Sequence, residues 1–393
     1  MVDIYTDIAF FMKWINETVM NIGGMMACDR TLESTPVKGL YVKHLCMLRI
    51  ELICVSSYHC YPDIICSELG PTAEALHMTE DTVVLLTGGS VYQGGQWSAL
   101  ASSEVYPSTG SCSPVPLLPE PRAYHALFTT GGPISRVAAC GGWSLNGDFI
   151  ASCLALDPLS QLWDENEIGP LPNPRGYHTA ISLGNIGTYM IGGLGGPNSG
   201  RTTDFLAFGN QQWVNGPTIP CDMAKGPCSV AITDISFLVI GGEKIREYQV
   251  DTNNPTSESG WQDESKWPDL QTIRNYWFGC SLTNANVIVA GGGGDEDGAF
   301  YTTEVVNLET RKITFAEHLS SPRRGFHIMT IVRDGSESVL GLAGWNGFGV
   351  HYSSVEEFDP FSLTWNTMQN SLLARRSFYG AVVVPKTLIC GEQ

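Results

Sequence analysis

Short apolar runs that end in two small residues recur along most of the chain. Five copies end in Gly-Gly and the last ends in Ala-Gly; they occupy residues 83–89, 137–142, 189–193, 237–242, 287–292 and 339–344. The first small residues of successive copies lie 53, 51, 49, 50 and 52 residues apart. A period near 50 residues predicts a repeat architecture in which each unit forms one structural element.

A second motif repeats with the same period: a basic residue that an aromatic residue usually follows within two or three positions. Its six copies begin at Arg122, Arg175, Lys225, Arg274, Arg324 and Arg376. Each begins 33 or 34 residues after the first small residue of a pair. An alternating segment and, in most units, a tryptophan lie between the two motifs. Each unit therefore predicts four short strands, and no stretch after residue 80 has helical periodicity.

The repeats predict how the units assemble. One four-stranded sheet leaves two apolar faces and unpaired edges, so the units must stack on one another around an axis. We therefore predict an all-β fold, a six-bladed β-propeller with four antiparallel strands per blade. Residues 81–393 form the predicted propeller, and residues 1–80 form a poorly defined, irregular N-terminal extension. Residues 387–391 resemble the strand that precedes a glycine pair, which predicts that a further, truncated unit begins there.

The chain resembles kelch-repeat proteins over about residues 83–385, and it is most similar to secreted kelch-repeat proteins of invertebrates. Segments 103–112, 116–125 and 140–142 carry the closer likeness. The resemblance implies that strand 379–384 completes the blade begun at Val83. It also implies a disulfide bond between Cys112 and Cys140, in adjoining blades; two buried free thiols are the alternative. Cys228 and Cys280 are a second candidate pair.

Composition and charge narrow the classes of partner. The formal net charge is −18, and no basic stripe suited to nucleic acid is visible. No apolar stretch approaches the length of a membrane span, and residue 1 does not open a clean secretion signal. The twelve cysteines do not decide between an oxidising and a reducing cellular compartment. An extracellular location is favoured over a cytoplasmic one, and disulfide bonds would mark an oxidising compartment.

Candidate chemical groups mostly repeat with the scaffold. His125, His178 and His327 recur at one position of the motif, which favours a structural role. For the arginines Arg122, Arg175, Arg274, Arg324 and Arg376 we expect hydrogen bonds to strand carbonyls or ion pairs with a neighbouring blade; a basic ring that binds an anion is the alternative. Phosphate loops, nucleophile elbows and paired Cys-x-x-Cys motifs are missing. The sequence thus predicts no enzyme, cofactor or metal.

The leading hypothesis is a non-enzymatic propeller that binds a protein partner of unspecified identity. Strand direction alternates in each blade, so the loops after the glycine pairs and those before each basic motif emerge on one side. The candidate partner-binding residues on these loops are Tyr92, Trp97, Trp143, Phe300, Tyr301, Trp345, Phe348 and Tyr352, with the acidic Asp295, Glu296 and Asp297. Aromatic residues commonly anchor interfaces. A partner that is basic where it meets the acidic residues fits this surface.

Two other functions are carried as alternatives. The first is an intracellular kelch scaffold or substrate-recruiting adaptor, although residues 1–80 are too short and irregular for the BTB dimerisation domain of many such proteins. The second is a copper oxidase, since galactose oxidase shares the kelch architecture. Outside the repeated motif the propeller offers only His318 and His351 as histidine ligands. The oligomeric state is left open.

Overall fold

The computed structural model describes residues 82–107, 115–130, 136–196, 199–223, 226–293, 298–333 and 336–390. Every described residue belongs to the unit Gly70–Gln393. The predicted N-terminal extension and the acidic residues Asp295, Glu296 and Asp297 lie outside the described residues.

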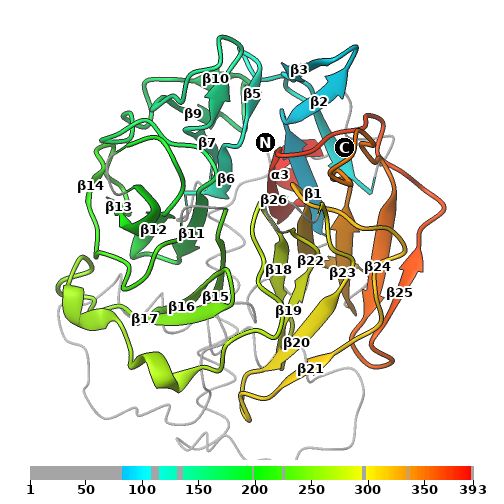
Figure 1. The fold of residues 1–393 in the computed structure, drawn as a ribbon. Coiled ribbons are helices and arrows are strands. Elements are labelled where there is room, and N and C mark those ends of the chain that lie inside the picture. Colours follow the sequence, from blue (N-terminus) through cyan, green and yellow to red (C-terminus); the bar gives the residue numbers. More distant parts are fainter. Residues whose placement is uncertain are drawn as a thin grey trace, which may run out of the picture. The chain divides into compact units, whose positions relative to one another are not determined.

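Six antiparallel sheets follow one another in chain order around a common axis and form a six-bladed β-propeller (Figure 1). The first blade contains β26 (Gly380–Pro385), β1 (Thr82–Thr87) and β4 (Ser103–Tyr106). The second contains β6 (Ala126–Thr129), β7 (Val137–Cys140), β9 (Cys153–Leu156) and β10 (Trp163–Asp164). The third contains β11 (Thr179–Leu183), β12 (Gly187–Ile191), β13 (Thr203–Ala207) and β14 (Val214–Asn215).

The other three blades complete the ring. The fourth contains β15 (Cys228–Thr233), β16 (Ser236–Gly241) and β17 (Lys244–Gln249), and a single bridge from Tyr248 to Trp261 stands at its outer edge. The fifth contains β18 (Gly279–Leu282), β19 (Asn286–Ala290), β20 (Thr303–Asn307) and β21 (Ile313–Phe315). The sixth contains β22 (His327–Arg333), β23 (Ser336–Leu342), β24 (Val355–Asp359) and β25 (Thr364–Thr367).

Smaller elements lie outside the blades. Two short ribbons pair β2 (Ser90–Gln93) with β3 (Gln96–Ala99), and β5 (Arg122–Ala123) with β8 (Trp143–Ser144). The described helices are η1 (Ser199–Arg201), η2 (Glu258–Gly260), η3 (Glu264–Lys266) and α3 (Lys386–Cys390). None of them is long and apolar enough to span a membrane.

The two ends of the propeller meet in one blade, as the sequence predicted. Strand β26 pairs antiparallel with β1, from Thr82 opposite Pro385 to Thr87 opposite Gly380, and the two lie side by side in Figure 1. The prediction that residues 387–391 begin a further strand is wrong, because Lys386–Cys390 forms the helix α3. β26 takes the end position of the first blade's sheet, next to β1, so the ring is already closed before residue 386.

The hydrophobic core lies between the blades. Six clusters of buried side chains each combine residues from two neighbouring blades. Tryptophans that follow the alternating segments pack into these interfaces: Trp365 of β25 is 7 % exposed and donates its indole N–H to Thr303 Oγ1 of the fifth blade over 2.9 Å. Aromatic side chains bury large apolar areas and therefore dominate the energetics of such a core.

The glycine pairs allow adjacent blades to approach closely. Gly142 has a φ of +106°, and a Cβ there would lie 2.5 Å from the carbonyl oxygen of Ala123. Its amide donates to the carbonyl of Arg175, in the loop that leads into the next blade, over 2.7 Å. The second small residue of four other pairs makes the equivalent bond: Gly89 to Arg122, Gly242 to Arg274, Gly292 to Arg323 and Gly344 to Arg376. Only glycine occupies such positions without steric cost.

Five buried arginines tie these loops to the blades that follow them. Each donates from Nη1 to the carbonyl that ends the second strand of its own blade: Arg122 to Gly141, Arg175 to Gly192, Arg274 to Gly291, Arg323 to Ala343 and Arg376 to Gly88. Four also pair with a third-strand carboxylate: Arg175 with Asp204, Arg274 with Glu304, Arg323 with Glu356 and Arg376 with Glu104. The carboxylates belong to the same blade, not to a neighbouring one as the sequence analysis allowed.

Two disulfide bonds occur among the described residues. Cys228 of β15 and Cys280 of β18 bond across the fourth and fifth blades, which confirms the second candidate pair. Cys140 bonds to Cys153, so the predicted bond from Cys140 to Cys112 is wrong. Cys140 and Cys153 stand directly opposite each other on β7 and β9, where the side chains of paired residues come closest. Cys112 lies outside the described residues.

Candidate functional site

The turn before the first strand of each blade has the same left-handed backbone. The residue at this point is Tyr124 (φ 57°), Tyr177 (60°), Gly226 (79°), Tyr276 (59°), Gly325 (61°) or Phe378 (54°). A left-handed conformation costs a residue with a side chain roughly 1–2 kcal/mol, and glycine adopts it freely. Four blades nevertheless place an aromatic residue there.

These turns are hydrogen-bonded to one another around the axis. The amide of Tyr177 donates to the carbonyl of Tyr124 (3.2 Å), and that of Tyr124 donates to the carbonyl of Phe378 (2.7 Å). The series continues from Phe378 to Gly325 (2.7 Å) and from Gly325 to Tyr276 (3.1 Å). These bonds connect five of the six turns to a turn of a neighbouring blade, and the aromatic side chains converge at the centre.

The converging side chains line a cavity of about 270 Å³, which we call the axial cup. Its lining residues are Trp97, Tyr124, Tyr177, Tyr276, Arg324, Trp345 and Phe378. Tyr124 stacks on Tyr177 with ring centroids 4.1 Å apart, and Trp97 meets Trp345 edge to face at 5.1 Å. The cup is slightly smaller than ordinary small-molecule pockets, which begin at about 300 Å³. It therefore suits one side chain or a small ligand.

One cation lies among the rings of the cup. The guanidinium of Arg324 is 4.6 Å from the ring centre of Trp345 and 5.1 Å from that of Tyr276. The main chains of Arg324 and Trp345 exchange two hydrogen bonds of 2.9 Å. Cation–π contacts and a paired backbone together fix the position of this arginine.

The stacked phenols of Tyr124 and Tyr177 stay neutral. Burial raises the pKa of Tyr124 well above its ordinary value of 10, and burial also raises the pKa of Tyr177. The lining contains no carboxylate, imidazole or thiol. A fixed cation surrounded by neutral rings suits binding, since proton transfer requires a group that titrates near the working pH.

His351 supports the tryptophan side of the cup. Its ring stacks on Trp345, and its Nε2 accepts the backbone N–H of Tyr92 over 2.9 Å. This bond assigns the proton to Nδ1, which lies 3.1 Å from Ser377 Oγ. Burial lowers the pKa of His351 to about 4, so the ring is neutral at physiological pH.

The structure places the predicted partner-binding residues in three groups. Trp97 and Trp345 line the cup, Tyr92 packs on Trp97 at 5.4 Å, and Trp143 lies 6.1 Å from the ring of Tyr124. Tyr301 and Phe348 are outside the cup and exposed, at 48 % and 77 %, and Phe300 is half-buried. The ring of Tyr352 covers the guanidinium of Arg323 at 5.0 Å and contributes to blade packing.

Sequence reasoning missed the residues that form most of the cup. Tyr124, Tyr177 and Phe378 were visible in the repeated motif, but recurrence favoured a scaffold role. The motif was also assigned one residue too late in the sixth blade: Arg323 is the buried structural arginine, and Arg324 faces the cup. The adjacent pair Arg323-Arg324 was the one signal in the sequence that pointed to a second role.

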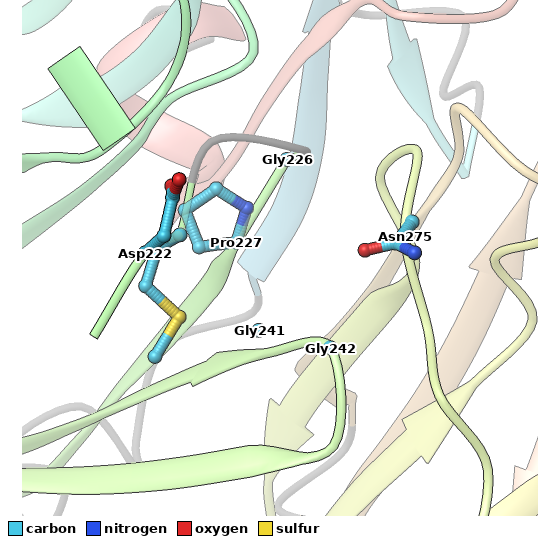
Figure 2. Close-up of a pocket in the computed structure, with 7 residues that line it drawn as sticks. Asp222, Gly226, Pro227, Gly241, Gly242 and Asn275 are labelled. Atoms are coloured by element: carbon cyan, nitrogen blue, oxygen red, sulfur yellow. The ribbon is translucent and has the colours of Figure 1, made fainter. Parts of the chain in front are cut away.

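A second cavity, of about 230 Å³, lies at the loops of the fourth and fifth blades. Figure 2 shows Gly241 and Gly242 at the turn between β16 and β17, with Asp222 and Asn275 on opposite sides. Glycine and proline backbone forms much of its wall, and Asp222 supplies the one charged side chain of its lining. Among the described residues, no three histidine, cysteine or carboxylate side chains converge as a metal site.

The closed ring of six sheets and the axial cup define a six-bladed β-propeller with an aromatic recess on one face. No family model and no curated protein matches the chain. The solved structure of YjhT, itself a propeller, is similar with a TM-score of 0.53 and 13 % sequence identity. The match covers 74 % of this chain and 95 % of that one, and it shows the fold alone.

Proposed function

We propose that this chain is a non-enzymatic, kelch-type propeller that binds a partner protein through the face that carries the axial cup. One observation carries the proposal: four blades hold an aromatic residue in a left-handed turn where two others use glycine. The aromatic side chains must contribute enough to offset roughly 1–2 kcal/mol of backbone strain at each position. Strain of this kind concentrates at functional sites.

The composition of the face supports a protein partner. Tryptophan, tyrosine and arginine are the residues that most often dominate binding energy at interfaces. Trp97, Trp345 and Arg324 lie together in the cup, and the exposed Phe348 lies on the loop that follows Trp345. A concave centre with an apolar, exposed rim is the form expected of a surface that receives a projecting side chain.

The histidine contacts argue against a copper oxidase. His178 Nε2 contacts the carbonyl of Cys140 at 3.1 Å, and His327 Nε2 contacts that of Tyr379 at 2.9 Å. His125 Nε2 bonds to Thr87, and His351 Nε2 accepts from Tyr92. These nitrogens serve the scaffold, and His318 alone among the propeller histidines is exposed.

An extracellular location is part of the proposal, and the two disulfide bonds support it. Disulfides persist in oxidising compartments and are rare in reducing ones. Counting free thiols on protein from its native source separates this location from that of an intracellular adaptor. Bonded Cys228 and Cys280 support the proposal; free thiols at both positions would favour the adaptor.

The test of partner binding compares two double variants of the full chain. Trp345→Ala with Phe348→Ala removes aromatic area from the cup face. Leu159→Ala with Phe361→Ala removes two exposed apolar side chains, 94 % and 96 % exposed, from turns between third and fourth strands on the opposite face. We expect a partner retained by the wild type to be lost with the first variant and kept with the second. Equal retention by both folded variants would refute the proposal.

A further inference from the structure

The connection between the second and third strands is much shorter in the fourth blade than in the others. In the other five blades it comprises residues 88–102, 141–152, 192–202, 291–302 and 343–354. Two of these long connections supply Trp97 and Trp345 to the lining of the cup. In the fourth blade, Gly242 and Glu243 alone join β16 to β17. The fourth blade therefore lacks the length of chain that carries the rim of the cup elsewhere.

The cavity of about 230 Å³ lies at this short turn, and we call it the notch (Figure 2). Its wall includes Gly226, Pro227, Gly241, Gly242 and Asn275. A Cβ at Gly242 would meet no atom within 4 Å, so this part of the wall faces open space. Glycine backbone without side chains lets a second main chain approach closely. The notch therefore suits a peptide main chain.

Asn275 supplies the polar group that a peptide main chain requires. Its own main chain is fixed, because Asn275 and Gly293 exchange two backbone hydrogen bonds of 3.1 Å. Its side chain is half-buried and points toward the space opposite Pro227 (Figure 2). Within the described part of the chain, no group forms a hydrogen bond with this carboxamide. A carboxamide offers both donors and an acceptor, so it can pair with the C=O and N–H groups of a peptide.

The notch and the cup are neighbours along the chain. Asn275 lines the notch, and the next residue, Tyr276, lines the cup. The cup, at about 270 Å³, has room for one side chain. Successive side chains of an extended strand point to opposite faces. A strand whose main chain lies in the notch can therefore direct one side chain into the cup and its neighbours away from it.

We propose that the notch binds the main chain of an extended peptide segment of the partner, with a peptide group paired to the Asn275 carboxamide and one apolar side chain in the cup. This inference rests on the proposed function and specifies the form of the partner. An extended segment leaves its peptide N–H and C=O groups free to bind. The interior peptide groups of a helix already bond to one another.

The first experiment titrates the full chain with acetyl-Ala-Phe-Ala-N-methylamide. Its matched analogue carries ester oxygens in place of the N–H groups of Phe and the second Ala. Ligand-observed NMR measures both dissociation constants, and we expect about 1 mM for the peptide. The ester analogue should bind about 10-fold more weakly, because it lacks these donors. The side-chain NH₂ signal of Asn275, identified by its absence from the Asn275→Leu spectrum, should shift with the peptide.

An asparagine pair assigns the hydrogen bonds to the notch. Asn275→Leu keeps the size of the side chain and should weaken the peptide about 10-fold. The variant should fold, because the carboxamide bonds to no described residue. Asn210→Leu is the matched control: Asn210 is exposed in the turn between β13 and β14, on the face opposite the cup. It should bind the peptide as the wild type does.

A glycine pair tests the space in the notch. Gly242 and Gly209 have φ values of 60° and 76°, and a Cβ at either would meet no atom within 4 Å. Asparagine tolerates this left-handed backbone, so both Gly242→Asn and Gly209→Asn should fold. The first places a side chain in the notch and should weaken the peptide about 5-fold or more, because it obstructs the main chain. The second lies on the opposite face and should leave binding unchanged.

Several results would overturn the inference. They are equal binding of the ester analogue, undiminished binding to folded Asn275→Leu or Gly242→Asn, and no binding of the peptide at about 20 mM, well above the expected dissociation constant. The partner itself separates the two proposals. If the peptide fails and the partner is lost with Trp345→Ala and Phe348→Ala but kept with Asn275→Leu, the partner presents a folded surface: the inference fails and the proposed function stands. If the peptide binds as expected but the partner survives the loss of Trp345 and Phe348, the notch is a peptide site and the proposed function fails.

Discussion

Replacing Glu304 by glutamine tests the buried ion pair that joins a blade to its arginine. Glu304 and Arg274 are both 0 % exposed, and Arg274 Nη2 donates to Glu304 Oε1 over 2.9 Å. Glu304 Oε2 accepts the amide of Gln271 over 2.7 Å, and Oε1 accepts that of Thr272 over 3.1 Å. Glutamine keeps the shape of the side chain, so the change removes charge and one acceptor without leaving a cavity.

The expected loss follows from these contacts. Both carboxylate oxygens face donors, so the amide NH₂ of glutamine must point at an N–H group on one side. Breaking a buried ion pair from one side costs about 3–5 kcal/mol, since the remaining charge stays buried. The second blade shows that a carboxylate is not obligatory: Arg122 is paired with Ser152 Oγ, and burial lowers its pKa to about 10. In the fifth blade, however, two backbone amides depend on Glu304 as well.

The assay is denaturant and thermal unfolding of the wild type, Glu304→Gln and the exposed control Glu309→Gln. A loss of about 3–5 kcal/mol corresponds to a fall in Tm of about 5–8 °C for a propeller of this size. The control should stay within about 0.5 kcal/mol, as surface substitutions usually do. A loss below about 1 kcal/mol for Glu304→Gln would refute the reasoning that this pair and its amides hold the loop to the blade.

Two further predictions concern acid and the disulfides. Burial lowers the pKa of His178 to about 3 and that of His351 to about 4. The folded protein keeps both rings neutral, so their contribution to folding stability is complete above the unfolded-state pKa near 6.5. It is lost as pH falls toward 4, because the unfolded chain binds protons first. Thermal melts should show stability falling by up to about 1.4 kcal/mol per pH unit for each histidine, and an unchanged slope in His351→Gln would contradict this. The bond from Cys228 to Cys280 spans 52 residues, so its removal by a double alanine variant should cost up to about 4 kcal/mol. The other disulfide spans 13 residues and should cost about 3 kcal/mol or less, and the reverse order would refute the loop-length argument.

The sequence predicted most of the fold because its signals are local and repeated. Apolar runs, glycine pairs and the basic motif mark strands and turns within each unit, and six copies compensate for the weakness of any one. The family resemblance of the sequence predicted that strand 379–384 joins the blade of Val83, as β26 does. The repeats also placed Cys228 and Cys280 on the first strands of adjoining units, where they bond.

Features within one blade were harder to predict where two neighbouring residues compete for one role. In the pair Arg323-Arg324, the spacing to the glycine pair favoured Arg324, but the structure buries Arg323 against Glu356. A shift of one residue moves a side chain from the blade to the axis, and spacing alone does not resolve it. Cys140 likewise bonds to Cys153 on the opposing strand of its own blade. The prediction missed this partner because it looked for one in the adjoining unit.

The sequence by itself determined the number of blades and their strand order, since these depend on the period and on local strand and turn propensity. Only the tertiary structure decided the axial cup. Trp97, Tyr177 and Trp345 come from three different blades, and nothing in the sequence near any of them refers to the others. Closing the ring brings one turn from each blade to the axis, and the left-handed backbone at those turns directs their side chains to a common centre. Convergence of this kind is a property of the closed ring, so the same aromatic residues indicate scaffold in one repeat and a binding site only in the assembled propeller.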